Sequence, residues 1–190
     1  MKPKDDDKLQ AIAEATFVLV EQTGLSGLTM AAIARQAGIA TGTLYVYYRS
    51  KEELLTGLYE QAKSATVEQV MRGYDPAAPF RSRFQRKWLN LVNHRLTRYS
   101  EAVFMEQYYN SPWFSEASRQ LSARFIADWQ AMYEEGQAQL ILKNVPTPLL
   151  IASFMGSVRE TANLVRSGGL DGTEATFEQA FAICWDGLKA

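Results

Sequence analysis

The sequence predicts an all-α protein of about nine helices, and three observations support this fold class. Apolar side chains recur every three or four residues through most of the 190 residues, which is the spacing of a helix that buries one face. Glycine, proline and short polar residues interrupt this pattern where helices would begin and end. No stretch alternates apolar and polar residues as a half-buried strand does.

The helices follow from these signals in chain order. The first is expected over residues 7–22, where Ile12 and Phe17 belong to a buried stripe and Gly24 ends the helix. Thr29 is placed to cap a second, short helix over residues 30–37. The others are expected from residue 41, then over residues 51–71, 80–96, 100–109, 116–140, 148–166 and 174–188.

Composition excludes several classes of protein. The net charge of −1 argues against a generally basic protein that coats nucleic acid, but allows a local DNA-binding surface. The single cysteine, Cys184, rules out an internal disulfide and suits a reducing cytoplasm. The N-terminus lacks the apolar core of a signal peptide, and no apolar run reaches the ~18 residues of a membrane span.

Residues 24–55 predict a helix-turn-helix. The helix that begins at Met30 is followed by a tight turn, residues 38–40, and a second short helix from Thr41. In this motif the second helix enters the major groove of DNA. The small residues at the start of that helix would let its backbone approach the base edges closely.

The side chains of the second helix suit this use. The hydroxyls of Thr41 and Thr43 can hydrogen-bond to bases or phosphates, and the methyl groups of Thr43 and Val46 can contact a thymine methyl. Leu44 is expected to face the core. Tyr48 is open to either interpretation, as a core residue or as a DNA contact.

The segment ThrGlyThrLeuTyr, the pair Tyr47-Tyr48 and the following Ser50-Lys51 resemble the recognition helix of the TetR/AcrR family of bacterial transcription regulators. The resemblance covers residues 9–55, and the helix count matches along the whole chain. It implies that five residues face the groove, Thr41, Gly42, Thr43, Tyr45 and Val46, and that three touch phosphates, Thr29, Tyr47 and Lys51. Ala31 stands where the family can carry a base-reading arginine, so we expect DNA shape to contribute more to specificity.

Two domains are predicted, with their boundary inside the long helix near residue 52. Residues 1–51 would form the DNA-binding domain and residues 52–190 a regulatory domain for ligand binding and dimerisation. The segment 73–79 is the clearest break in the helical pattern.

Large aromatic residues crowd the regulatory part. Aromatic residues at helical spacing usually form core, but an apolar pocket with a few polar groups is also the common form of a small-molecule site. The resemblance places an effector inside the fourth to eighth helices. The predicted ligand-binding residues are Tyr59, Trp88, Phe104, Tyr108, Phe125, Trp129, Phe154 and Arg159, with Arg95, Glu106 and Asn163 as further polar candidates.

These side chains favour a small hydrophobic or aromatic effector, and a cationic one would also fit. No cofactor is expected. His94 is the only histidine and has no cluster of ligands beside it, so no metal site is predicted.

The last two helices carry apolar stripes that suit either an intramolecular core or a subunit seam. The resemblance favours the seam, formed by two helices from each subunit of a homodimer. The predicted dimer residues are Leu150, Phe154, Val158, Phe177, Phe181, Cys184 and Leu188. Such a dimer would read a palindromic double-stranded operator whose half-sites lie about 34–36 Å apart.

The sequence therefore predicts a cytoplasmic, homodimeric repressor that a small molecule releases from DNA. One alternative is a DNA-binding dimer without a small-molecule inducer. A second is an enzyme that uses the aromatic pocket, although no nucleophile elbow, phosphate loop or metal motif is present.

Overall fold

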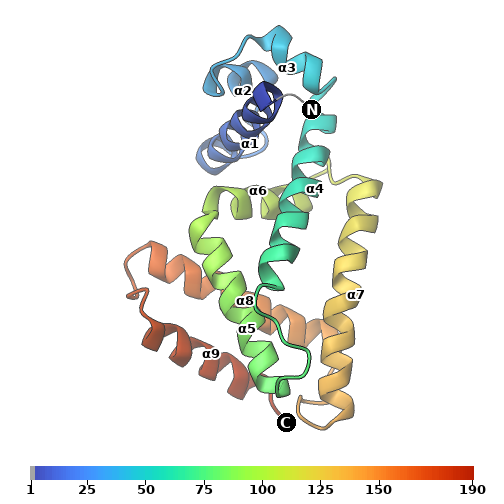
Figure 1. Cartoon of the computed structure of the whole chain (residues 1–190), viewed down its shortest axis with the longest axis vertical. Helices are drawn as coiled ribbons and strands as arrows, with labels where there is room; N and C mark the ends of the chain where they lie inside the picture. Colours follow the sequence, from blue (N-terminus) through green and yellow to red (C-terminus); the bar gives the residue numbers. More distant parts are fainter. Residues whose placement is uncertain (1–2) are drawn as a thin grey trace. The chain divides into compact units, whose positions relative to one another are not determined.

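The computed structural model describes residues 3–190, and nine helices make up this part of the chain (Figure 1). The signal-peptide prediction concerns in part residues 1 and 2, which lie outside the described residues. The helices are α1 (Pro3–Thr23), α2 (Met30–Gln36), α3 (Thr41–Tyr47), α4 (Lys51–Val70), α5 (Phe80–Thr97), α6 (Tyr99–Tyr109), α7 (Glu116–Ala138), α8 (Thr147–Arg166) and α9 (Glu174–Leu188). Within residues 3–190 the only extended pairing is a single antiparallel bridge between Leu142 and Lys189.

The predicted all-α fold is confirmed, and all the helices after the first begin within one residue of the expected position. The Thr29 hydroxyl oxygen accepts a hydrogen bond from the Ala32 N–H at 3.1 Å and so satisfies a free donor of α2. Ser115 and Thr173 cap α7 and α9 in the same way. The first helix begins at Pro3, earlier than expected, because the acidic residues before Lys8 are also helical.

The chain packs as two compact units. The first joins residues up to 64 with residues 98–121, and the second joins residues 65–97 with residues 122–190. Packing therefore extends the N-terminal unit beyond residue 51 and adds α6 to it. The functional division at residue 52 remains a prediction.

In the first unit, α6 lies against α1, and α2 packs on both α1 and α3 (Figure 1). Its core is formed by side chains that α1–α4 and α6 bury completely. They include Ile12, Ile33, Leu44, Leu54 and Phe104.

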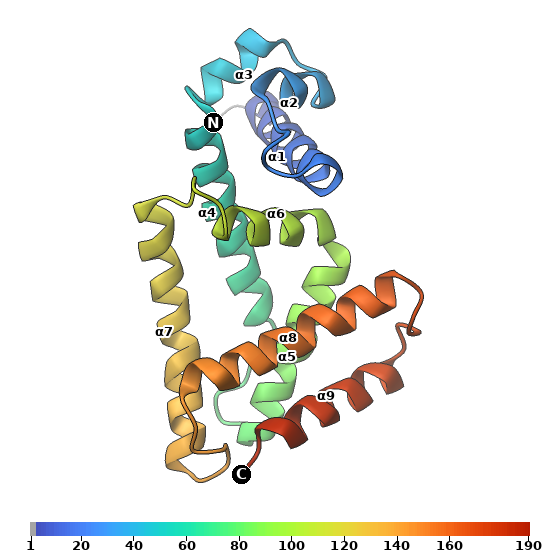
Figure 2. The ribbon, with the colours of Figure 1, turned by 180° about the vertical axis from the view of Figure 1, so that it is seen from behind.

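In the second unit, α5 packs across α8, and α9 lies beside both helices (Figure 2). The core is a cluster of rings that meet edge to face, an arrangement that aromatic quadrupoles favour. The Phe84 and Phe154 rings, for example, have centroids 4.8 Å apart at 71°. Gly136 leaves room for this packing, because a Cβ there would lie 2.6 Å from the Phe80 ring.

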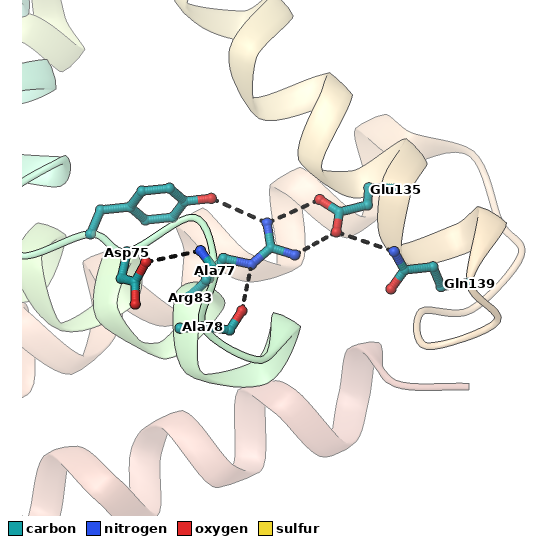
Figure 3. Close-up of polar contacts among 7 residues, drawn as sticks. Asp75, Ala77, Ala78, Arg83, Glu135 and Gln139 are labelled. Carbon is teal, nitrogen blue, oxygen red and sulfur yellow. Dashed lines mark hydrogen bonds and ion pairs between the residues drawn. The ribbon is translucent and has the colours of Figure 1, made fainter.

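A polar clamp fastens the α4–α5 loop to α7 (Figure 3). The Arg83 guanidinium binds both carboxylate oxygens of Glu135, with Nη1 donating to Oε2 at 3.0 Å. It also donates to the Tyr74 hydroxyl at 3.2 Å and to the Ala78 carbonyl at 3.1 Å. The hydrogen bonds from Arg83 hold the pKa of Glu135 below its ordinary value.

The apolar stripes of α8 and α9 are intramolecular core, one of the two alternatives that the sequence left open. Six of the seven predicted dimer residues are buried within the second unit, where they pack on α5 and on each other. They are Leu150, Phe154, Val158, Phe181, Cys184 and Leu188. Phe177 is half-buried at the edge of this core.

Candidate DNA-binding site

The turn between α2 and α3 depends on a glycine. Gly38 has a φ of +68°, which lies in the left-handed region. Glycine adopts this conformation easily, whereas a residue with a side chain would be strained there. The next residue, Ile39, donates its N–H to the Ala34 carbonyl at 3.0 Å and closes the end of α2. Ile33 of α2 and Leu44 of α3 are both fully buried, so the two short helices share one core.

The burial of Leu44 decides which side of α3 faces outward. Thr41 and Gly42 are exposed, and so are Tyr45 and Val46, with 50% and 81% of their surface accessible. Thr43 is half-buried. The structure thus brings four of the five predicted groove residues to one open face, with Thr43 at its margin.

The residues predicted to touch phosphates are in different environments. Thr29 is exposed, and its hydroxyl hydrogen can still donate while the oxygen caps α2. Tyr47 and Tyr48 are half-buried against the core of the first unit. Burial, and then the charge of Glu53, raise the pKa of Tyr48, so its hydroxyl stays neutral.

Lys51 has a structural role that the sequence did not reveal. Its ammonium donates to the Leu25 carbonyl at 2.9 Å and to the Leu28 carbonyl at 2.7 Å, and it lies 4.5 Å from the centre of the Trp113 ring. Burial lowers the pKa of this ammonium. Two of its three N–H donors therefore hold the loop between α1 and α2, which leaves one for a phosphate.

Helix α6 holds the same loop from another side. The Gln107 side-chain oxygen accepts from the Leu25 N–H at 3.0 Å, and its amide donates to the Val20 carbonyl at 3.4 Å. The loop that precedes α2 is thus fixed by side chains of both α4 and α6. A glutamine on the inward side of α6 was the only sequence signal for this contact.

Two arginines of the predicted DNA-binding domain were also missed by the sequence-based predictions. Arg35, in the last turn of α2, and Arg49, just after α3, are both exposed. Arg35 lies outside the motif that carries the resemblance. Arg49 lies inside it, between Tyr48 and Ser50, but the resemblance implied no DNA contact for this residue. Exposed guanidinium groups beside a recognition helix suit phosphate contacts.

The predicted ligand-binding residues do not come together in one cluster. Tyr59, Phe104 and Tyr108 belong to the core of the first unit, and Trp88, Trp129 and Phe154 belong to the core of the second. Phe125 is half-buried, and Arg159 is exposed beside Glu160, with which it forms an ion pair.

Among residues 3–190 no group of histidine, cysteine and acidic side chains is arranged to hold a metal ion. None of the described helices is long and apolar enough to span a membrane.

The two short helices and their exposed recognition face define a helix-turn-helix regulator, and comparisons with known proteins agree. A family model described as bacterial regulatory proteins, tetR family, matches residues 12–58. A second, described as tetracyclin repressor-like, C-terminal domain, matches residues 79–189. The chain belongs to the TetR family of transcription regulators, which are not enzymes.

Individual relatives resemble the chain over most of its length. It is 24% identical over 164 residues to a helix-turn-helix-type transcriptional regulator of Haemophilus influenzae, and the match covers 86% of this chain and 84% of that one. A TetR-family regulator from Marinobacter aquaeolei VT8 has a similar crystal structure, with a TM-score of 0.90, 26% identity, and coverage of 100% and 99%. A TetR-family regulator from Shewanella sp. PV-4 shares the fold, with a TM-score of 0.78, 23% identity and coverage of 96% and 98%.

Proposed function

We propose that the outer face of α3 reads an operator in the major groove, as one half of a homodimer. The observation that carries the proposal is the open face of Thr41, Gly42, Tyr45 and Val46, opposite the buried Leu44. Thr43 and the hydroxyl groups of Thr29 and Tyr47 would border this face, and Lys51 would add one N–H to a phosphate. Because no long charged side chain stands on the face, direct base recognition is limited, and DNA shape supplies part of the specificity.

Fluorescence anisotropy tests this proposal, with DNA from the region upstream of the gene and a scrambled duplex. The protein is expected to prefer the upstream DNA by about a thousandfold or more. Tyr45→Ala should reduce this preference without changing the melting temperature. Tyr109→Ala is the matched control, because that tyrosine is 51% exposed but lies at the end of α6. Equal loss in both variants would contradict the assignment of α3.

Dimerisation is proposed to use the outward faces of α8 and α9, since their inward stripes are already buried. The exposed apolar residues on these helices are Leu149, Met155, Leu164 and Ile183. Gly187 lies one turn after Ile183 with open space around it, so a partner helix could approach closely. TetR-family regulators act as dimers, which supports a seam on these faces.

We further propose that a small hydrophobic or aromatic molecule releases this cytoplasmic repressor from DNA. Support comes from the ring cluster of the second unit, where the Tyr133 hydroxyl is buried without a hydrogen-bond partner among the described residues. The Trp129 and Phe154 rings both lie beside Tyr133, each with its centroid 6.4 Å from that of the Tyr133 ring, and their own centroids are 5.3 Å apart. An effector that enters this cluster could pair with the hydroxyl. The effector could lower DNA affinity only by as much as it binds the released state more tightly than the DNA-bound state.

The alternative without a small-molecule inducer is favoured by the packing itself. Within each cluster the rings contact one another. Tyr59 contacts Tyr108 in the first cluster, and Phe84 contacts Phe154 in the second. A screen of aromatic compounds separates the two proposals. A compound that releases the operator and raises the melting temperature supports an effector, and a screen in which none does supports the alternative.

A further inference from the structure

A groove of about 530 Å³ lies between α5 and α9 of the second unit. It adjoins the aromatic cluster of the second unit, because two of its lining residues, Leu89 and Phe177, pack against that cluster. None of the predicted ligand-binding residues lines it. Its walls are mainly polar, with amides and a guanidinium on α5 and two carboxylates on α9. The chemistry of these walls identifies a class of ligand.

Asn90 is a largely buried residue that supplies a hydrogen-bond acceptor to the groove. Its side chain is only 7% exposed, and its amide nitrogen donates to the Val70 carbonyl at 3.0 Å and to the Arg72 carbonyl at 2.8 Å. Both N–H bonds of the amide are used, so the orientation of the group is fixed. No donor among the described residues reaches its oxygen, Oδ1, which is therefore the polar atom that Asn90 can present to the groove. A fixed acceptor of this kind favours a ligand that carries an N–H or O–H donor.

The opposite wall determines the charge of that ligand. Glu174 and Glu178 lie one helical turn apart on α9, and Arg86 is the only cation among the lining residues. Two carboxylates against one guanidinium leave the lining with one excess negative charge. Leu89 and Phe177 provide apolar contacts between the polar walls, and an aromatic ring also attracts a cation.

We propose that this groove binds a small organic cation with N–H donors, that is, a primary or secondary amine attached to a short apolar segment. The amine donates to Asn90 Oδ1 and to the carboxylates of Glu174 and Glu178, while the apolar segment lies on Leu89 and Phe177. This site goes beyond the function proposed above, because it uses neither the Tyr133 hydroxyl nor the DNA-binding face. Failure of one proposal leaves the other standing.

A titration of the intact, isotope-labelled protein followed by NMR tests the site directly. The two probes are n-butylammonium and n-butyltrimethylammonium, which carry the same charge but differ in N–H donors. Butylammonium should shift the side-chain amide of Asn90 and the backbone amides of residues 174–178, with saturation. The quaternary probe should bind at least about threefold more weakly, because it cannot donate to Oδ1.

Charge variants supply the second test. Glu174→Gln and Glu178→Gln should each weaken butylammonium binding by about two- to fivefold. Both residues are exposed, so these variants should fold. Asp171→Asn is the matched control, since it removes the same charge from an exposed position outside the groove, and it should leave binding unchanged. The proposal would be overturned if butylammonium caused no saturable shifts, or shifts only at other residues. It would also be overturned if both probes bound equally, or if Asp171→Asn weakened binding as much as the glutamate variants.

Discussion

Tyr133 and Tyr108 bury similar hydroxyl groups with opposite outcomes. The Tyr108 hydroxyl is 3.0 Å from the Thr56 hydroxyl and 3.2 Å from that of Ser118. The Tyr133 hydroxyl has no partner among the described residues, and burial raises its pKa far above the ordinary value. At the scale of single residues, one hydroxyl stabilises the fold and the other costs free energy in the absence of a ligand.

Removal of the Tyr133 hydroxyl is therefore expected to stabilise the protein. Tyr133→Phe should raise the free energy of unfolding by about 1 kcal/mol, because it deletes an unpaired buried group. Tyr108→Phe, the matched control, should lower it by about 1 kcal/mol. Denaturant unfolding of the two variants measures both effects. A loss of stability in Tyr133→Phe would show that the hydroxyl is paired.

Arg49 gives a second prediction at this scale, since it is exposed beside α3. Arg49→Gln should weaken binding to operator and scrambled DNA alike and reduce the salt slope by about 1, as expected of one lost phosphate contact. Arg124→Gln, an exposed arginine on α7, is the control and should change neither quantity. A loss of affinity for operator DNA alone would instead indicate that Arg49 contacts the bases.

At the scale of elements, each short helix depends on contacts distant in sequence. Helices α2 and α3 have seven residues each, too few for stability in isolation. The loop before α2 is held by Lys51 of α4 and by Gln107 of α6. The sequence correctly predicted the helices and their caps from local signals. It missed these braces, because nothing local indicates where a lysine or glutamine will find a carbonyl.

The clamp of α7 on the α4–α5 loop gives a prediction that depends on pH. The pKa of Glu135 is lower in the folded protein than in the unfolded chain, because Arg83 binds the charged form. The contribution of the charged Glu135 side chain to the free energy of unfolding is therefore fully present above its pKa in the unfolded chain. It is lost as the pH falls through its pKa in the folded protein. At neutral pH, Glu135→Gln should lower the free energy of unfolding by about 1 kcal/mol, since the pair is partly exposed.

Unfolding measured at several pH values checks this contribution. The difference between the wild type and Glu135→Gln should shrink as the pH falls below about 4. Glu134→Gln serves as the control, because that side chain is exposed and lacks the arginine partner. A difference that stays constant with pH would exclude the charged clamp as its cause.

At the scale of the whole molecule, the apolar residues of α8 and α9 divide into two sets. The inward set closes the core of the second unit, and the outward set, which includes Ile183 at 76% exposure, has no covering within one chain. Isolated exposed apolar residues are common, but several on two adjacent helices suit an interface between subunits.

Ile183→Glu is expected to separate the dimer. A carboxylate at the centre of an apolar seam would lose hydration without a partner, so dimer affinity should fall by at least about tenfold. Ile126→Glu on α7 introduces the same change at an exposed site and should leave the association unchanged. Sedimentation equilibrium measures both variants. A wild-type monomer, or an unaffected dimer in Ile183→Glu, would contradict the proposed seam.

The sequence alone determined the all-α fold, the helix starts after the first helix, the turn at Gly38 and the family. These features depend on local signals, namely periodicity, capping side chains and a motif of fixed spacing. Only the tertiary structure decided that Lys51 braces a loop, that the aromatic residues form two clusters, and that the stripe through Phe181 is core. The physical reason is that an amphipathic helix specifies which face is buried, but not whether the covering surface comes from the same chain or from a partner.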